Sequence, residues 1–326
     1  MIKVLVTGAT GFTGGKLAQR LVADGHEVVA FVRPSSDTKH LREIGVECRA
    51  VDIRDPNDVM RNFVRVQKVF HIAAAYRSEL ADRAEFRTVN VDATKNLLDA
   101  AYKYGVDRFV HCSTVGVQGE IEAPPASEDY RLKPGDHYQE SKLDGERLAL
   151  EYSRSGLPVS VVRPVGIYGP GDTRFLKLFR PIQRGRFVMV GTGESLYHMT
   201  YIDDLIDGFI LAGERFEALG EVFTIAGPEY TTVRELVDTI ADVLGRSRPR
   251  MRVPFKPVYW ASVICDNICR AANVSPPLYP RRVEFFHLDR AFSIAKAQQL
   301  LGYQPKVGLS DGLARTAAWY RHEGIL

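Results

Sequence analysis

Residues 4–14, VLVTGATGFTG, constrain the fold of this chain more than any other stretch. The short apolar, β-branched run at residues 2–6 is typical of a parallel strand that is buried on both faces. Gly8, Gly11 and Gly14 then follow at every third position. Because glycine lacks a Cβ atom, this spacing allows a tight turn, a close approach of backbone N–H groups to a pyrophosphate, and close packing of the next helix on the strand. We therefore expect a strand, a phosphate-binding turn and a helix whose N-terminus faces the phosphate.

The residues after the glycine turn support a nucleotide-binding interpretation. An amphipathic run at residues 16–22 is followed, after Gly25, by a second apolar run at residues 28–32. A glycine triplet alone also occurs in ordinary strand-to-helix turns, so by itself it is weak evidence. Together with the flanking runs it forms a strand, a helix and a strand of the length expected for a βαβ unit, which favours nucleotide binding.

Alternating strands and helices over residues 1–165 predict a Rossmann-type α/β fold, in which a doubly wound parallel sheet carries helices on both faces. Long helices are expected over about 84–104, ending at Gly105, and over about 138–155. The expected strands are short apolar runs at 2–6, 27–32, 46–51, 68–73, 107–112 and 158–163.

Beyond Pro164 the chain changes to loops rich in glycine and proline. Residues 166–326 are therefore expected to form a smaller α/β substrate-binding lobe. Within them, a helix and a strand at about 200–226 are expected to rejoin the first sheet. An amphipathic helix is expected at 231–246, capped by Thr231 or Thr232. The two lobes are thus predicted to be interleaved.

Composition and charge argue against several classes of protein. The 326 residues are 45% hydrophobic and 25% charged, which is ordinary for a globular protein. A net charge of +3 with scattered Lys and Arg residues does not predict nucleic-acid binding. The four cysteines have neither zinc-type spacing nor companion histidines, so no metal is expected. No apolar run reaches about 18 residues and no signal-like leader precedes the first strand, so we expect no transmembrane segment and a cytoplasmic location.

The apolar segment at residues 253–280 has three interpretations: packing core, a wall of an apolar substrate pocket, or a surface that touches a membrane. Its apolar residues include Trp260, Ile264 and Ile268. Core packing is the interpretation we favour, because buried apolar helix faces are the commonest case. Charged residues inside the segment, such as Lys256, argue against a membrane-spanning helix.

Tyr138 and Lys142 are the strongest candidates for chemistry. Their i, i+4 spacing places a phenol and an ammonium on the same face of a helix. A tyrosine normally loses its proton at about pH 10. A nearby ammonium favours the phenolate, so the tyrosine could exchange a proton with an alcohol or ketone near neutral pH. The same spacing also occurs on ordinary solvated helices, and the motif alone is a poor signal.

The strand expected at 107–112 is followed by Ser113 and Thr114. Ligands of such sheets bind at the C-terminal ends of the strands. A hydroxyl at this point could hold a substrate oxygen beside Tyr138, and the alternative is simple capping of the strand end.

A series of motifs runs through the chain in a fixed order: Thr7-Gly8-x-x-Gly11-x-x-Gly14, Asp52-Ile53-Arg54-Asp55, His71-Ile72-Ala73-Ala74, Asn90-Val91-Asp92-Ala93-Thr94-x-Asn96-Leu97, Ser113-Thr114, Tyr138-x-x-x-Lys142, Arg163-Pro164, Thr200-Tyr201-Ile202-Asp203-Asp204-Leu205 and Lys296-Ala297-x-x-x-Leu300-Leu301-Gly302-Tyr303-x-Pro305. In this order they resemble the extended short-chain dehydrogenase/reductases over nearly the whole chain. That superfamily includes nucleotide-sugar epimerases and dehydratases, 3β-hydroxysteroid dehydrogenases and dihydroflavonol reductases.

The resemblance implies a role for each matching residue. Tyr138 is the expected general acid/base, Lys142 holds the nicotinamide ribose and lowers the pKa of Tyr138, and Thr114 binds the substrate oxygen. Counting back five places from Gly119 selects Thr114 over Ser113. The resemblance also implies that the cofactor is bound by Gly8, Thr10, Gly11, Phe12, Gly14, Arg33, Asp52, Ile53, Ala73, Ala74, Ala75, Asn90, Tyr138, Lys142, Pro164 and Val165.

The end of the second strand bears on the choice of cofactor. An acidic residue there would bind the adenosine ribose hydroxyls of NAD, and none is present. Arg33, with nearby Ser35, Ser36 and Lys39, could instead bind a 2′-phosphate. A solvated arginine after a strand is the alternative. We therefore expect NADP(H) in preference to NAD(H).

Substrate binding is where the sequence departs from the best-known relatives. Nucleotide-sugar members commonly carry an asparagine and an arginine for the nucleotide phosphates, at positions that here hold Gly166 and Tyr197. Tyr76 and further aromatic residues would suit a less polar substrate, while Arg281 and Arg282 keep a phosphate site open. The sequence most resembles the steroid dehydrogenase and dihydroflavonol reductase branches. Gly166, Tyr197, Tyr76 and Thr114 are the expected substrate contacts.

Two enzymatic functions follow from this resemblance. The first is interconversion of a secondary alcohol and a ketone on a bulky, partly apolar small molecule by an NAD(P)-dependent oxidoreductase. The alternative is a nucleotide-sugar epimerase or dehydratase, in which the cofactor returns to its starting state. A non-catalytic binding protein is a third reading, against which the intact Tyr138, Lys142 and Thr114 argue. By analogy, the two long helices are expected to pair in a homodimer.

Overall fold

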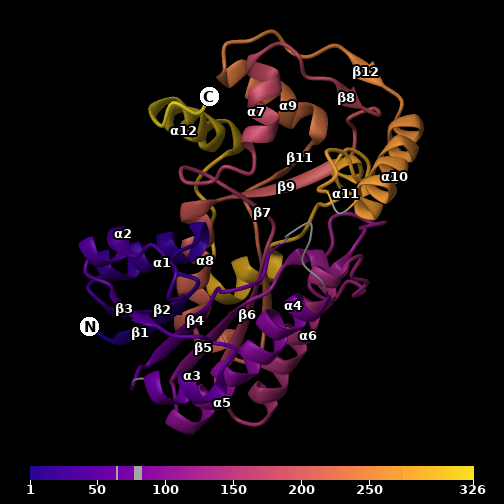
Figure 1. Ribbon diagram of the computed structural model, residues 1–326. Coiled ribbons are helices and arrows are strands. Elements are labelled where there is room, and N and C mark those ends of the chain that lie inside the picture. The colour runs from indigo at the N-terminus through magenta and orange to yellow at the C-terminus, as the bar shows by residue number, and fades with distance from the viewer. Residues whose placement is uncertain (64, 77–82, 273) are drawn as a thin grey trace.

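A computed structural model describes residues 1–63, 65–76, 83–272 and 274–326. Within these residues, seven strands form one entirely parallel sheet in the order β10-β6-β5-β4-β1-β2-β3 (Figure 1). The predicted doubly wound parallel sheet is thereby confirmed. The strands are β1 (Lys3–Thr7), β2 (Glu27–Val32), β3 (Glu47–Ala50), β4 (Lys68–His71), β5 (Arg108–Cys112), β6 (Val159–Pro164) and β10 (Val222–Ile225).

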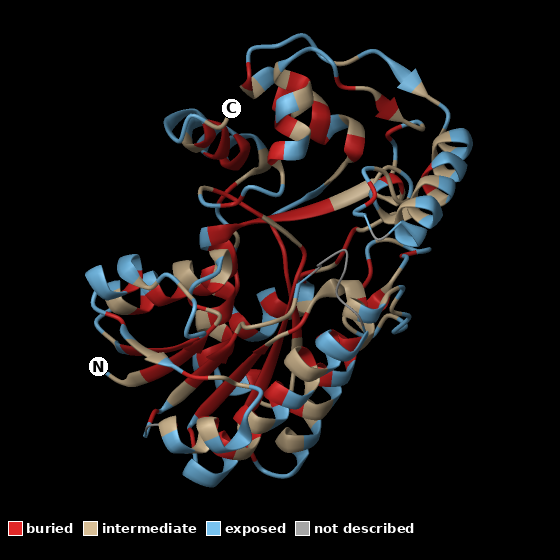
Figure 2. Cartoon of the chain, in the orientation of Figure 1, coloured by how far each residue is buried: buried red, intermediate tan, exposed pale blue. Residues whose placement is uncertain are grey.

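Helices cover both faces of this sheet, because the inner strands are apolar on both sides, whereas the edge strand β3 has no buried residue. Val4 and Val6 point into one core with the helices α1 and α8, whereas Leu5 and Val29 point into a second core with α3 and α5. Figure 2 shows the strands as buried along most of their length. The helices around the sheet are α1 (Phe12–Ala23), α2 (Lys39–Glu43), α3 (Pro56–Asn62), α4 (Arg83–Arg87), α5 (Ala93–Tyr104), α6 (His137–Arg154) and α8 (Ile202–Glu214).

The long helix expected over 84–104 is interrupted. A π-helical turn (η1, Thr88–Asp92) separates α4 from α5, so one extra residue is inserted at this point. The helix ends as expected at Gly105, which adopts a left-handed conformation with φ 63°. Sequence periodicity did not predict the π turn, which positions Asn90 as described below.

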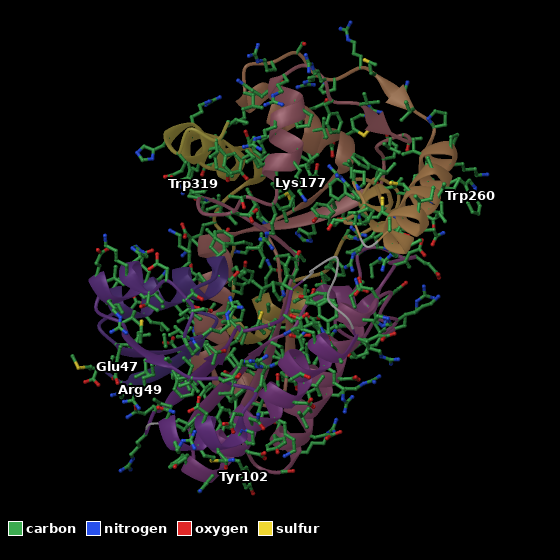
Figure 3. All side chains as sticks on the ribbon, in the orientation of Figure 1. Glu47, Arg49, Tyr102, Lys177, Trp260 and Trp319 are labelled. Carbon is green, nitrogen blue, oxygen red and sulfur yellow. The ribbon has the colours of Figure 1, made fainter. Side chains whose placement is uncertain are left out.

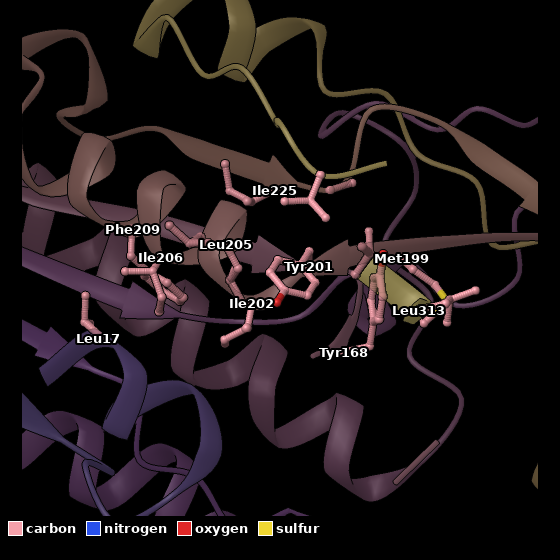
Figure 4. Packing of buried hydrophobic residues seen from close by; sticks show 14 of the residues in the cluster. Leu17, Tyr168, Met199, Tyr201, Ile202, Leu205, Ile206, Phe209, Ile225 and Leu313 are labelled. Atoms are coloured by element: carbon pink, nitrogen blue, oxygen red, sulfur yellow. The ribbon is translucent and has the colours of Figure 1, made fainter. Parts of the chain in front are cut away.

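The second lobe contains two small sheets and several helices (Figure 1). Thr232 caps α9 in a capping box with Glu235, which decides between the two capping residues expected from the sequence. Tyr168, Tyr201 and Ile225 lie in the core that joins this lobe to the sheet (Figure 4). The elements are β7 (Gly166–Tyr168), α7 (Leu176–Gln183), β8 (Met189–Val190), β9 (Leu196–Tyr201), β11 (Tyr230–Thr232), α9 (Val233–Val243), β12 (Arg252–Val253), α10 (Phe255–Ala271), α11 (Pro280–Glu284) and α12 (Leu309–His322).

One expectation about this lobe is wrong. The apolar residues of α10 were expected to pack in the core, but Trp260, Ile264 and Ile268 are 63%, 59% and 64% exposed. The helix lies at the edge of the molecule and packs on α11 along its other side (Figure 1). Only Ser262 of its 17 residues is buried.

The sheet reverses its strand order between β1 and β4. From β1 the chain proceeds outward to β2 and β3, and then returns to build β4, β5 and β6 on the other side. Ligands of open α/β sheets bind in the crevice at such a switch point, beyond the C-terminal ends of the strands. The glycine turn follows β1 and residues 73–75 follow β4, so both predicted cofactor segments meet there.

Candidate active site

The glycine turn after β1 is packed so tightly that side chains would not fit. Gly8 has φ 73°, and a Cβ atom there would lie 2.8 Å from the backbone nitrogen of Ala73. A Cβ atom on Gly14 would overlap the carbonyl oxygen of Gly8. The turn, the strand end of β4 and the start of α1 are therefore held in close contact by the absence of side chains.

The N-terminus of α1 fits a phosphate group. Gly11 is its N-cap and supplies no side-chain hydrogen bond, and the first turn contains no acidic residue. The first N–H groups of the helix thus lack intrahelical partners, and no acidic side chain of the first turn competes for them, which is the arrangement that binds pyrophosphate. Thr10 is exposed beside this turn and Phe12 is half-buried.

Phe12 is covered by a loop of the second lobe. The guanidinium of Arg174 lies 5.8 Å from the centre of the Phe12 ring and 5.9 Å from that of Tyr76. An ion pair of 2.5 Å with the buried Asp172 holds Arg174 in place. Arg174 thereby joins the glycine turn to the loop after β4, and no motif in the sequence indicated this contact.

Asn90 connects three parts of the site. Its Oδ1 accepts a hydrogen bond of 2.8 Å from the backbone nitrogen of Ala75, and its Nδ2 donates one of 2.9 Å to Ser141 Oγ. Ser141 in turn donates to the carbonyl of Tyr138 over 2.8 Å. The expected supporting position of Asn90 is thus occupied by a buried side chain on the π-helical turn, and Ser141 is a partner that sequence reasoning missed.

Tyr138 lies in the first turn of α6, between two aromatic rings. The Tyr76 ring meets it edge-on at 5.4 Å between centroids, and the Phe86 ring of α4 lies 6.0 Å away. Tyr138 is half-buried and Tyr76 is 48% exposed. The sequence proposed Tyr76 for this region, whereas Phe86 carried no recognisable signal.

Lys142 is almost completely buried, at 2% exposure. Its Nζ donates a hydrogen bond of 2.5 Å to the carbonyl oxygen of Cys112 at the end of β5. Burial lowers the pKa of the Lys142 ammonium below its ordinary value, and the groups of Cys112 and Glu146 oppose this shift. The ammonium is therefore anchored one helical turn from Tyr138, on the same helix face.

The loop after β5 brings Thr114 to the same region. A Cβ atom on Gly116 would lie 3.0 Å from the side chain of Gln139, so this loop packs directly on the first turn of α6. Thr114 is half-buried, and its Oγ1 accepts a hydrogen bond of 3.1 Å from the Gly116 nitrogen. Ser113 is only 3% exposed. The structure therefore leaves Thr114 the more accessible of the two hydroxyls.

A buried ion pair fixes α6 on the sheet. The Arg163 guanidinium at the end of β6 contacts both carboxylate oxygens of Glu146, at 2.9 Å and 2.5 Å. Both side chains are less than 5% exposed. Glu146 lies one turn beyond Lys142, so this pair orients the same face of α6 that carries Tyr138. The sequence identified Arg163 only as part of a motif and missed Glu146.

The residues expected to hold the adenosine half lie along the C-terminal edge of the sheet. Arg33 follows β2 and is exposed, without an ion pair to any other residue that the structure describes. The Asp52 carboxylate pairs with Arg54, which lowers the pKa of Asp52. Asn96 donates a hydrogen bond of 3.0 Å to the carbonyl of Ile53. Asp52 and Ile53 are thus held in a fixed turn after β3.

Beyond β6 the chain turns into the second lobe. Pro164 ends β6, and the nitrogen of the buried Val165 donates to the carbonyl of Ile225 over 3.3 Å. Gly166 then begins β7, and a Cβ atom on it would lie 2.7 Å from the hydroxyl oxygen of Tyr197 in β9. The two positions at which the sequence departs from nucleotide-sugar enzymes are therefore in direct contact.

An open hollow of about 730 Å³ lies elsewhere in the second lobe. Its walls include Val253, Phe255, Phe286 and His287, and none of Thr114, Tyr138 and Lys142 lines it. The candidate catalytic residues lie instead beyond the C-terminal ends of the strands, near the switch point of the sheet.

Comparisons with known proteins agree with this arrangement. The chain belongs to the NAD dependent epimerase/dehydratase family, whose model matches residues 4–226. The relatives and the fold make it an NAD-dependent oxidoreductase of the extended short-chain dehydrogenase/reductase type.

The individual relatives differ in the activity for which they are named. The chain is 33% identical to the 3-beta-hydroxysteroid dehydrogenase of Mycolicibacterium neoaurum, over 98% of this chain and 91% of that protein. It is 30% identical to the 2-alkyl-3-oxoalkanoate reductase of Stenotrophomonas maltophilia, over 97% and 99%. Among solved structures, the UDP-glucuronic acid 4-epimerase from Bacillus cereus in complex with NAD matches with a TM-score of 0.78 at 26% identity, over 99% of each chain.

Two histidines under the site predict a dependence of stability on pH. His71 and His111 are buried with ring centroids 5.5 Å apart. Burial, reinforced by the Lys142 ammonium, lowers the pKa of His71 from 6.5 to about 3 and that of His111 well below 6.5. Below pH 6.5 the unfolded chain binds protons that the folded chain excludes, so stability falls as the pH drops from 6.5 toward 3.

We expect the variant His111→Leu to reduce this acid sensitivity. Each histidine contributes a slope of about 1.4 kcal/mol per pH unit to the free energy of unfolding, so the variant should lose about that much slope between pH 6 and 5. Urea unfolding at a series of pH values measures it. His322→Gln is the matched control, because it replaces an exposed histidine outside this buried pair. An identical slope in His111→Leu and the wild type would contradict the prediction.

Proposed function

We propose that this protein is an NADP(H)-preferring oxidoreductase that interconverts a secondary alcohol and a ketone on a bulky, partly apolar small molecule. The observation that carries this choice is the contact between Gly166 and Tyr197. These are the two positions at which nucleotide-sugar relatives commonly carry side chains that bind the phosphate groups of the substrate.

The Tyr197 side chain takes up space that a residue at position 166 would need. Because its hydroxyl lies 2.7 Å from the position of a Cβ atom on Gly166, an asparagine there would require Tyr197 to move. The Tyr197 ring also meets Phe285 edge-on at 4.9 Å. A glycine and an aromatic side chain thus stand at the two positions where phosphate ligands would be expected, which supports a less polar substrate.

The proposed chemistry assigns each side chain one task. When bound, the nicotinamide cofactor supplies or accepts the hydride. Tyr138 gives a proton to the ketone oxygen in reduction and removes it from the alcohol in oxidation. Thr114 holds that oxygen, and Lys142 favours the phenolate form of Tyr138 by its positive charge. The ring of Tyr76 lies edge-on to that of the half-buried Tyr138, which limits the access of water to the Tyr138 side of the site.

The preference for NADP(H) rests on Arg33. Its guanidinium is exposed just past β2 and is not engaged in an ion pair with any described residue, so it is available to a 2′-phosphate. Ser35 is also exposed nearby. The cofactor itself would be held at the uncapped start of α1 and by Ala73, Ala74 and Ala75 beside Asn90.

A nucleotide-sugar epimerase or dehydratase is the second candidate function. The similarity to the UDP-glucuronic acid 4-epimerase favours it. Arg281 and Arg282 would have to serve the phosphates, yet Arg281 pairs with Asp136 at the start of α6 and Arg282 donates to the carbonyl of Pro277 over 2.9 Å. We also propose, by analogy alone, a homodimer formed through α5 and α6.

Calorimetric titration of the cofactor-free protein with NADPH, NADH and UDP tests the proposal. We expect NADPH to bind more tightly than NADH and UDP not to bind. In the variant Arg33→Ala, NADPH affinity should fall about tenfold or more while NADH affinity stays the same, because one charge-assisted phosphate contact is lost. Arg49→Ala, at the outer edge of the sheet on β3, is the control and should change neither affinity.

Two results would contradict this reading. Tight binding of UDP together with retained NAD would favour the epimerase. Equal loss of NADH and NADPH affinity in Arg33→Ala would show that Arg33 does not select for the phosphate.

A further inference from the structure

The outward face of α10 is a continuous apolar surface. Trp260, Ile264 and Ile268 follow one another at intervals of four residues, so they form one stripe along the helix. Each is about 60% exposed. Figure 3 shows Trp260 on the outer side of the helix, at the rim of the molecule. We call these three residues the α10 stripe.

The opposite face of α10 already has its packing partners. Phe255 stacks on His287 with 4.1 Å between ring centroids and on Tyr259 with 5.5 Å. Ser262, the one buried residue of the helix, lies on this side and donates to the carbonyl of Tyr259 over 2.6 Å. The stripe is therefore not needed to attach the helix to the rest of the protein.

The segment that leads into and forms α10 carries a net positive charge. Residues 246–272 contain six Lys and Arg residues and one acid, Asp266, a net charge of +5, whereas the whole chain carries +3. Arg250 and Arg252 precede the helix, Lys256 lies in its first turn, and all three are exposed. None of these three forms an ion pair within the parts of the chain that the structure describes. Met251, which lies between Arg250 and Arg252 in the sequence, is also exposed, at 66%.

We propose that the α10 stripe binds the surface of a lipid bilayer that contains anionic lipids. An amphipathic helix with tryptophan and isoleucine on one face and cations beside it inserts its apolar face at the headgroup boundary, while the cations attract anionic headgroups. None of the helices in the described parts of the chain has the length and apolar character needed to cross a bilayer. The proposal therefore concerns contact with one membrane surface.

Charge favours a bilayer over a second copy of the chain. In a symmetric pair the same patch meets itself, so the net positive charge around α10 would face an equal positive charge. An anionic membrane surface has the opposite sign. The charge and the apolar stripe then both favour binding to the same surface.

Flotation of the full-length protein with vesicles tests this contact without substrate or cofactor, so its result is independent of the proposed enzymatic function. We expect the protein to float with vesicles of phosphatidylcholine and phosphatidylglycerol, less with phosphatidylcholine alone, and less at 0.5 M salt because the charges are screened. Ile264→Ser/Ile268→Ser should weaken binding at least about tenfold, since two isoleucines that the bilayer would bury are lost. Arg250→Gln/Lys256→Gln should weaken binding to the anionic vesicles only.

Fluorescence locates the contact on the helix. The chain has two tryptophans, so Trp319→Phe leaves Trp260 as the only one. Its emission should shift to shorter wavelength with anionic vesicles, because the indole leaves water. Phe216→Ser is the control for flotation: Phe216 is 79% exposed in the short turn after α8, outside the stripe, and its loss should not change binding.

Three outcomes would overturn the proposal. In the first, the protein does not float with vesicles under any condition. In the second, equal amounts of the wild type and the double serine variant float with the anionic vesicles. In the third, the emission spectrum of Trp260 does not change when anionic vesicles are added. A double serine variant that lowers the molar mass in solution without affecting flotation would assign the stripe to a second copy of the chain instead.

Discussion

Replacing Tyr138 by phenylalanine should lower kcat about 10²–10⁴-fold, the usual contribution of a positioned proton donor or acceptor. The ring contacts with Tyr76 and Phe86 persist in the variant because only the hydroxyl is removed. We therefore expect the protein to fold normally and NADPH to bind with little change. Rates measured with a ketone that the wild type reduces, together with calorimetric titration of NADPH, give both quantities.

Tyr152→Phe is the matched control for this experiment. Tyr152 lies on the same helix α6, but its hydroxyl pairs with Asp99 on α5, away from the site. It should cost some stability and leave kcat near the wild-type value. A Tyr138→Phe variant with wild-type kcat would rule out Tyr138 as the acid/base and with it the proposed mechanism.

The largest expected effect on stability comes from Glu146. The variant Glu146→Gln removes the charge that compensates the buried Arg163 guanidinium and leaves that charge in a medium where water cannot solvate it. Breaking such a pair costs about 3–5 kcal/mol in the free energy of unfolding. Urea unfolding at constant pH measures the loss, and the helix face that carries Lys142 should also become less rigid.

Two further variants separate charge from packing at this position. Glu151→Gln, on the exposed side of the same helix, should change stability by less than about 0.5 kcal/mol. The double variant Glu146→Met/Arg163→Met removes both charges and should recover a large part of the loss. A loss below about 1 kcal/mol in Glu146→Gln would show that Arg163 finds sufficient compensation elsewhere, for example from the Glu128 carbonyl that it already contacts.

The strands and the glycine turn could be predicted because their signals are local. The apolar runs around β1, β2 and β6 mark strands that are buried on both faces, and their positions agree with the structure within a residue or two. Gly8 and Gly14 are required by contacts with backbone atoms, which leave no room for any side chain. Such requirements restrict the residue type itself and are therefore visible in a sequence.

The π-helical turn at Thr88–Asp92 could not be predicted in the same way. Its residues are ordinary helix residues, and the turn coincides with contacts to other elements: Asn90 bonds Ala75 and Ser141, and Gly145 allows α6 to approach the Asn90 carbonyl closely. These partners lie on separate elements. No local pattern can therefore indicate the insertion.

The sequence by itself determined the parallel sheet, the glycine turn and the helix face shared by Tyr138 and Lys142, because each depends on neighbours in the chain. Only the tertiary structure decided that Tyr197 fills the space beside Gly166, that Glu146 compensates Arg163, and that the α10 stripe is exposed. These features join residues far apart in the chain, and whether an apolar helix face is buried depends on which elements cover it. The hydrophobic pattern of a sequence predicts that a helix has an apolar face, but it does not predict which element or surface covers that face.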